Sequence, residues 1–127
     1  GTLRRDMADN PALIAHHAPS EATFTEYFDH IHPVNLVEGG VLERAYKTES
    51  LDVVSVHYQG VDKLGVGLTV EATAPDGVVE AISANMNGAP VLAVQWHPEW
   101  KAHENPQSQT FFKLLGRALR REPLVAS

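Results

Sequence analysis

"VLAVQWHPEW", residues 91–100, decides the fold, because a short apolar run ends abruptly in a proline-centred turn. Its first six residues form the near-continuous apolar segment that is typical of strands buried on both faces. Pro98 then disfavours a helical conformation at His97 and favours extended backbone. The stretch therefore predicts a buried strand that carries His97 and Glu99 at its end.

The spacing of His97 and Glu99 suggests chemistry. In extended backbone, residues i and i+2 lie on the same side of the chain, roughly 6 to 7 Å apart. A carboxylate beside one imidazole nitrogen fixes the tautomer, so that the other nitrogen can move a proton to or from a nucleophile. Two other interpretations stay open: a solvated surface pair, and a metal site of His97, Glu99 and His103, which lacks a clear further ligand.

Further elements are predicted on the N-terminal side of this strand and after it. Alternating apolar residues predict strands at 32–40 and 51–59, and "PDG" predicts the turn of a hairpin over 68–84. The strand at 51–59 ends at His57, and ligands of open α/β sheets bind beyond the carboxyl ends of strands. "SVHYQG" and "WHPEW" are therefore expected to meet at one crevice. A short helix is predicted at 41–48, a turn at 87–90 and a closing amphipathic helix at 105–121, with an apolar face of Phe111, Phe112, Leu114, Leu115, Ala118 and Leu119.

Residues 1–127 are read as part of a single domain with two regions. Residues 1–32 sustain neither helical nor strand periodicity for long, which predicts a loop-rich segment that covers a site. His16, His17, His30 and His32 are expected to be exposed there. Residues 33–127 carry the strands, the hairpin and the terminal helix.

Composition excludes several classes of function. A net charge of -6 and only ten Lys and Arg residues give no electrostatic footprint for nucleic acid. No apolar run approaches the roughly 20 residues that span a bilayer, so we expect no membrane partner and a soluble, cytoplasmic protein. The chain has no cysteine, which excludes a disulfide, a thiolate metal site and a cysteine nucleophile on this chain.

A family resemblance follows from these residues. "VLAVQWHPEW" resembles the final strand and the His-x-Glu of class I glutamine amidotransferases. "VVSVHYQGVDKLGVGLTVEATAPDGVVEAIS", residues 53–83, is similar to the γ-glutamyl-γ-aminobutyrate hydrolase branch, the peptidase C26 type. "GTL" at residues 1–3 resembles the end of that family's "GGTL" segment, so the resemblance covers nearly the whole chain.

The resemblance implies an α/β fold, a three-layer αβα sandwich of the flavodoxin-like type, of which this chain is the C-terminal portion. It implies that His97 and Glu99 are catalytic and that His57, Tyr58 and Gln59 face the substrate. The family's cysteine nucleophile precedes the point where this chain begins. The implied partner is therefore a cysteine-bearing N-terminal half, from the same gene or a companion chain, and this chain alone is expected to be inactive.

The implied reaction is hydrolysis of a γ-glutamyl amide such as γ-glutamyl-γ-aminobutyrate, as in putrescine degradation. No metal and no other cofactor is expected. Two alternatives stay open: an inactive module that binds a γ-glutamyl ligand or docks onto a partner, and the glutaminase part of an amidotransferase. Homo-oligomerisation is also left open.

Overall fold

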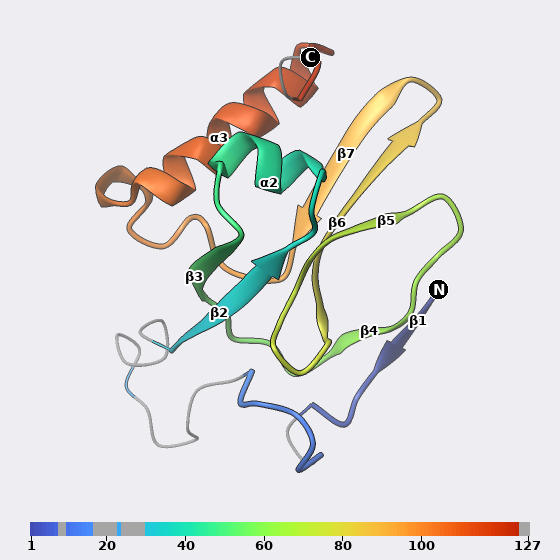
Figure 1. Ribbon diagram of the computed structural model, residues 1–127, viewed down its shortest axis with the longest axis vertical. Coiled ribbons are helices and arrows are strands. Elements are labelled where there is room, and N and C mark those ends of the chain that lie inside the picture. Colours follow the sequence, from blue (N-terminus) through green and yellow to red (C-terminus); the bar gives the residue numbers. More distant parts are fainter. Residues whose placement is uncertain (8–9, 17–22, 24–29, 125–127) are drawn as a thin grey trace.

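The main body of the protein is one antiparallel sheet. The computed structural model describes residues 1–7, 10–16, 23 and 30–124 (Figure 1). Five strands follow the order β3-β2-β5-β6-β7, and every neighbouring pair is antiparallel. The strands are β2 (Ile31–Leu36), β3 (Ser50–Val54), β5 (Thr69–Thr73), β6 (Val79–Met86) and β7 (Ala89–Val94). A separate antiparallel pair joins β1 (Thr2–Arg4) to β4 (Gly60–Lys63).

Both predicted turns connect neighbouring strands. Between β5 and β6, the amide of Gly77 donates to the carbonyl of Ala74 at 2.9 Å, and Gly77 has a φ of 86°. Between β6 and β7, Asn87 and Gly88 both have positive φ, as a tight hairpin turn requires. The predicted hairpin over 68–84 and the turn at 87–90 are confirmed.

The two predicted helices are confirmed as α2 (Val41–Tyr46) and α3 (Pro106–Leu119). A 3-10 turn that was not predicted, η1 (Ala102–Glu104), precedes α3. Asn105 caps α3 by accepting from the amide of Gln107 at 2.9 Å, and Pro106 occupies the first turn, where no amide donor is needed. The apolar face of α3 is narrower than predicted, because Phe111 and Leu114 are buried whereas Phe112 and Leu119 are exposed.

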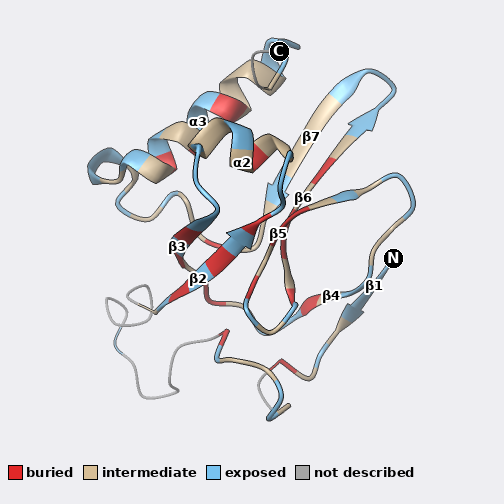
Figure 2. Cartoon of the chain, viewed as in Figure 1, coloured by how far each residue is buried: buried red, intermediate tan, exposed pale blue. Residues whose placement is uncertain are grey.

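The hydrophobic core lies between the sheet and the two helices. Figure 1 shows α2 and α3 side by side, and the hydroxyl of Tyr46 in α2 donates to the carbonyl of Gln107 in α3 at 2.8 Å. Figure 2 shows buried positions in β2, β3 and the inner sides of both helices. The core cluster consists of Val34, Leu36, Leu42, Leu51, Val53, Ala72, Ala81, Trp96 and Leu114.

The mixed α/β class is confirmed. The described strands pair only antiparallel, and α2 and α3 pack on the same core cluster, so the three-layer αβα sandwich stays a prediction. One expectation about the sheet needs correction. The strand of residues 91–96 is not buried on both faces. It ends at Val94, pairs with β6 at one edge of the sheet, and its apolar side chains are half-buried or exposed. A short apolar run fits a hairpin edge as well as a sheet centre, so composition alone did not distinguish them.

The segment before β2 is more than a covering loop. Residues 2–4 form β1, and Met7 is buried in a second cluster with Ala74 and Val78 of the β5–β6 turn. The amide of Ile14 donates to Asp76 Oδ2 at 2.9 Å, and the carbonyl of His16 accepts from the amide of His57 at 2.6 Å. The described residues of this segment therefore belong to the folded body.

Candidate functional site

The His97–Glu99 pair forms as the sequence predicts. Glu99 Oε1 lies 2.7 Å from His97 Nδ1, a distance typical of a charge-assisted hydrogen bond. The side chains of His97 and Glu99 are 31% and 61% exposed. The imidazole is thus oriented by a carboxylate at the surface of the described body, where a reacting group can reach it.

The end of β3 holds this pair in place. The amide of His97 donates to the carbonyl of Val54 at 2.8 Å, and His97 Nε2 lies 3.4 Å from the carbonyl of Val56. Trp96 anchors the turn because its side chain is buried in the core. The segments 51–59 and 91–100 therefore meet, as predicted from the ends of the two strands.

A substrate-sized pocket is not closed around His97 by the described residues. The cavity that His97 lines, together with Trp96 and Trp100, has a volume of about 90 Å³. Ligand pockets begin at roughly 300 Å³. The cavity beside His97 is therefore too small to enclose a ligand of that size.

The "HYQ" segment points in two directions. The ring of His57 turns inward: its side chain is 9% exposed, Nε2 lies 3.2 Å from Glu80 Oε1, and Nδ1 lies 2.7 Å from the carbonyl of Gln59. Tyr58 and Gln59 are exposed. The substrate-facing role of these three residues stays a prediction, and within it only Tyr58 and Gln59 are placed at the surface.

A buried cluster of histidines and carboxylates was missed by the sequence analysis. Glu80 in β6 is 1% exposed and accepts from the hydroxyl of Ser55 at 3.2 Å. His16 lies between two carboxylates, with Nε2 2.7 Å from Asp76 Oδ2 and Nδ1 3.0 Å from Glu80 Oε1. His32 Nε2 lies 3.6 Å from Glu80 Oε1. One signal was available, because the alternation of 31–36 puts His32 on the same face as Val34 and Leu36.

The expectation of exposed histidines is therefore wrong for two of the four. His16 is 0% and His32 is 6% exposed. They are buried because carboxylates on β6 and on the β5–β6 turn approach their ring nitrogens, and these partners are distant in sequence. His30 is partly exposed, with Nε2 2.8 Å from the carbonyl of Ala15. His17 lies outside the described residues.

The pKa values of this group reflect burial and pairing. Burial lowers the pKa of His16, but Glu80 and Asp76 outweigh it and raise the pKa overall. Burial lowers the pKa of His32. Burial would raise the pKa of Glu80, yet the close contacts with His16 and His57 bring it below its usual value. The pKa of Asp76 is lowered in the same way, against burial, by His16 and by backbone amides.

The metal-site alternative at His97, Glu99 and His103 finds no support. Within residues 1–7, 10–16, 23 and 30–124, the one group of three potential metal ligands close enough to share an ion is His16, His32 and Glu80. His103 is instead next to Glu104, 3.4 Å away, at an exposed position.

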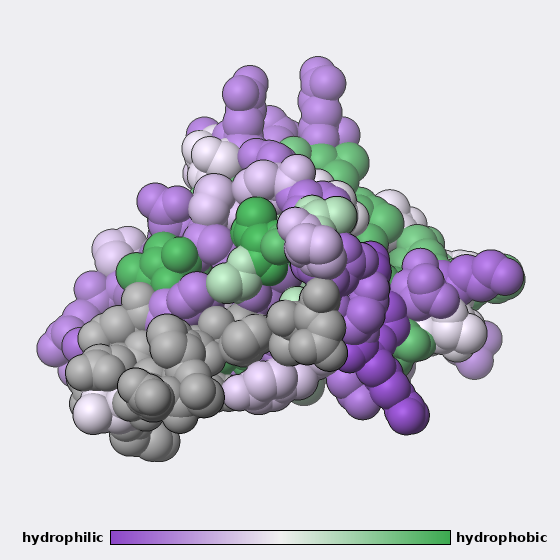
Figure 3. Space-filling model, turned by 90° about the horizontal axis from the view of Figure 1, so that it is seen from below, coloured by the Kyte–Doolittle hydropathy of each residue, from purple (hydrophilic) through white to green (hydrophobic). Residues whose placement is uncertain are grey.

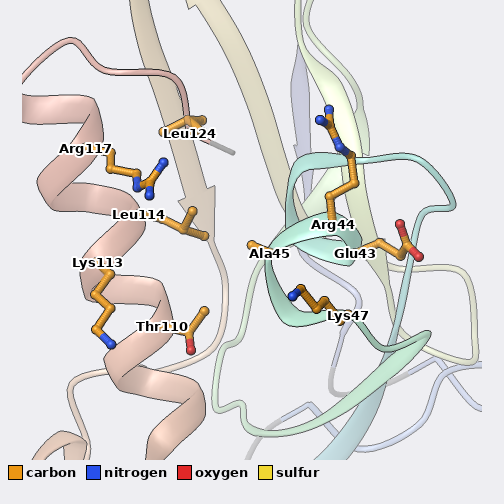
Figure 4. A pocket seen from close by; sticks show the side chains of 9 residues that line it. All are labelled: Glu43, Arg44, Ala45, Lys47, Thr110, Lys113, Leu114, Arg117 and Leu124. Carbon is orange, nitrogen blue, oxygen red and sulfur yellow. The ribbon is translucent and has the colours of Figure 1, made fainter. Parts of the chain in front are cut away.

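Another groove of the described residues lies away from the candidate site. It has a volume of about 750 Å³ and runs between α2 and α3, where Ala45 and Leu114 point toward one another (Figure 4). None of its lining residues belongs to 94–100. The lining is Glu43, Arg44, Ala45, Lys47, Thr110, Lys113, Leu114, Arg117 and Leu124.

Comparison with known proteins decides the family. The sequence profile of peptidase C26 matches residues 1–99, which include the His97–Glu99 pair. The chain belongs to the peptidase C26 family. This family is of the class I glutamine amidotransferase-like kind, as the "WHPEW" stretch predicted.

Individual relatives agree with the peptidase C26 assignment. The chain is 36% identical over 114 residues to the γ-glutamyl-γ-aminobutyrate hydrolase PuuD of Escherichia coli, across 89% of this chain and 44% of that protein. It is 38% identical over 101 residues to a Mycobacterium tuberculosis protein named "Putative glutamine amidotransferase", across 78% of this chain and 30% of that protein. The peptidase C26 chain thus spans less than half the length of these relatives.

Within the part of the chain whose structure is described, no helix combines the length and apolarity needed to cross a bilayer.

Proposed function

We propose that the protein containing this chain hydrolyses γ-glutamyl amides through a cysteine thioester, with His97 as the proton carrier. The observation that supports this proposal most directly is the 2.7 Å contact between His97 Nδ1 and Glu99 Oε1 in a peptidase C26 chain. A relative named for γ-glutamyl-γ-aminobutyrate hydrolysis supports the choice of substrate class. Glutamate and a small amine are the products.

The reaction proceeds in two half-reactions. A cysteine thiolate attacks the γ-carbonyl carbon, the carbon–nitrogen bond breaks, and protonated His97 gives its proton to the departing amine. Neutral His97 then takes a proton from water, the resulting hydroxide attacks the thioester, and glutamate and the thiolate are released. Glu99 holds the ring and stabilises its protonated form in both steps.

The nucleophile comes from a cysteine-bearing N-terminal half, because this chain has no cysteine. That half and this chain together form the three-layer αβα sandwich, and they close the substrate pocket that the cavity beside His97 only begins. Tyr58 and Gln59 face the glutamyl end of the substrate from this chain, with His57 beneath them. The chain alone is inactive.

Steady-state kinetics test this proposal. The complete protein is assayed with γ-glutamyl-γ-aminobutyrate and with free glutamine. We expect a higher kcat/KM for γ-glutamyl-γ-aminobutyrate and release of the amine into solution. A clearly higher kcat/KM for glutamine, or ammonia delivered to a bound synthetase, would instead support the amidotransferase role for which other relatives are named.

A second candidate function rests on the absence of cysteine. Without a nucleophile, the same site serves to bind a γ-glutamyl ligand or to dock onto a partner chain. The intact mass and the N-terminal sequence of every polypeptide in the purified protein distinguish the two. A polypeptide with cysteine favours the hydrolase, whereas its absence favours the binding module.

A further inference from the structure

Three side chains from distant parts of the sequence converge on one point inside the protein. His16 lies before β2, His32 lies in β2 and Glu80 lies in β6. One ligand atom of each lies within 4.8 Å of the other two, and all three side chains are buried. No role in the proposed hydrolysis is assigned to His16, His32 or Glu80.

The outer nitrogens of the histidines are already engaged. His16 Nε2 lies 2.7 Å from Asp76 Oδ2, and His32 Nδ1 lies 2.9 Å from the carbonyl of Pro33. His57, which borders the same point, has Nδ1 2.7 Å from the carbonyl of Gln59. These oxygens only accept, so each outer nitrogen carries a proton, and the inner nitrogen is the atom that remains to bind a cation.

The inner nitrogens all face the same carboxylate oxygen. Glu80 Oε1 lies 3.0 Å from His16 Nδ1, 3.2 Å from His57 Nε2 and 3.6 Å from His32 Nε2. Two of these buried nitrogens, His16 Nδ1 and His32 Nε2, have no hydrogen bond of acceptable geometry. A proton on an inner nitrogen or a metal ion between these nitrogens and Glu80 Oε1 is needed to compensate the buried carboxylate.

We propose that this point is a divalent metal site, with His16 Nδ1, His32 Nε2 and Glu80 Oε1 as ligands. Imidazole and carboxylate ligands suit Zn²⁺, which binds them at about 2.0–2.2 Å in tetrahedral geometry. A tetrahedron with bonds of that length has edges of about 3.3 Å. The distances from His16 Nδ1 and His32 Nε2 to Glu80 Oε1, 3.0 and 3.6 Å, bracket this value.

The surroundings have the form that metal sites require. Asp76 on the outer nitrogen of His16 gives the carboxylate–histidine–metal arrangement that orients a ligand and raises its basicity. Ser55 holds the second oxygen of Glu80. With three protein ligands, a water molecule completes the tetrahedron. The ion joins His16, which precedes β2, to β2 and β6.

Metal content and cobalt spectroscopy test the proposal. The polypeptide that carries this sequence is purified without a metal-affinity tag, stripped with a chelator, and titrated with Co²⁺ and then Zn²⁺. We expect one metal ion per chain, the visible absorption of tetrahedral cobalt, and its loss as Zn²⁺ displaces Co²⁺. Zn²⁺ also raises the midpoint of thermal unfolding, because it binds the folded state. Folded protein that binds neither ion would overturn the proposal, whatever its hydrolase activity.

Variants locate the ion. His32→Gln and Glu80→Gln each remove a ligand, and Asp76→Asn weakens affinity by about 10–100-fold through the outer nitrogen of His16. His103→Gln is the control, because its side chain is 79% exposed and belongs to the alternative site that finds no support. Circular dichroism confirms that each variant is folded, and Glu80→Gln serves if His32→Gln does not fold. Binding that survives both ligand changes, or that His103→Gln abolishes, contradicts the assignment.

Discussion

At the scale of single residues, His97 and Glu99 contribute unequally to the proposed reaction. His97 handles the proton in both half-reactions, whereas Glu99 orients the ring across 2.7 Å and stabilises its charge. Removing the His97 imidazole abolishes proton transfer. Replacing the Glu99 carboxylate by an amide keeps a hydrogen-bonding group beside the imidazole but removes the negative charge that stabilises its protonated form.

We therefore predict that His97→Ala lowers kcat of the complete enzyme by about 10²- to 10⁴-fold, the usual contribution of a positioned acid or base. Glu99→Gln lowers kcat less. Hydrolysis of γ-glutamyl-γ-aminobutyrate measures both, and His103→Gln, on the exposed turn after the site, is the control. If both variants retain nearly full activity, the pair does not act as part of a triad.

At the scale of elements, β5 supplies what α2 lacks at its start. The residue at the N-cap of α2 is Gly40, which has no side chain to accept from the first amides of the helix. Glu71 of β5 is 2% exposed, accepts from the hydroxyl of Ser83 at 2.5 Å and from the amide of Leu42 at 3.3 Å. A Cβ at Gly40 would come within 2.5 Å of Glu71 Oε2, so glycine leaves room for this carboxylate.

We predict that Glu71→Ala lowers the free energy of unfolding by about 1–3 kcal/mol, because a buried amide and a hydroxyl lose their acceptor. Urea denaturation measures this change. Glu49→Ala, an exposed acidic position in the connection from α2 to β3, is the matched control and is expected to change little. Equal stability of the two variants would show that Glu71 does not support α2.

The contact between α2 and α3 predicts a dependence on alkaline pH. Burial raises the pKa of Tyr46 to about 12, from a model-compound value of 10.0. The folded state therefore binds more protons than the unfolded state between these values. The stabilisation is complete below pH 10 and is lost as pH rises toward about 12.

We predict that Tyr46→Phe flattens the fall of stability between pH 10 and about 12, relative to the unmodified protein. Thermal or urea unfolding across that range measures the slope, and near-ultraviolet tyrosinate absorbance follows ionisation. Tyr58→Phe is the control, because Tyr58 is 54% exposed and outside the core. An unchanged slope in Tyr46→Phe would mean that other groups cause the alkaline loss.

At the scale of the whole molecule, the described body leaves surfaces that favour association. β3 and β7 each pair with one strand only within the five-stranded sheet. Exposed strand edges can pair with other chains. Figure 3, seen from below, shows separate green apolar patches among hydrophilic side chains. Exposed apolar side chains include Leu3, Ile31, Val66 and Leu119.

We predict that the 127-residue chain, produced alone, associates or is poorly soluble, and that the cysteine-bearing half suppresses this association. Sedimentation velocity of the chain, with and without its companion, measures the effect. A monomer that unfolds cooperatively on its own would contradict the prediction.

By itself, the sequence determined the local elements and the site pair. Periodicity and turn chemistry are local, so the sequence alone predicted the hairpin at 68–84, the turn at 87–90 and the helix α3. The His97–Glu99 contact was readable too, because Pro98 and a spacing of two residues determine it within one short segment.

Only the tertiary structure decided which strands pair and which side chains from distant segments come into contact. An edge strand and a central strand share the same composition, so the position of β7 depended on its pairing with β6. β1 and β4 are too short to show a period and form only through each other. The histidine–carboxylate cluster joins His16, His32 and Glu80 across distant segments. None of these three residues belongs to a local sequence motif that would single it out. Only their burial next to one another shows that they form a cluster.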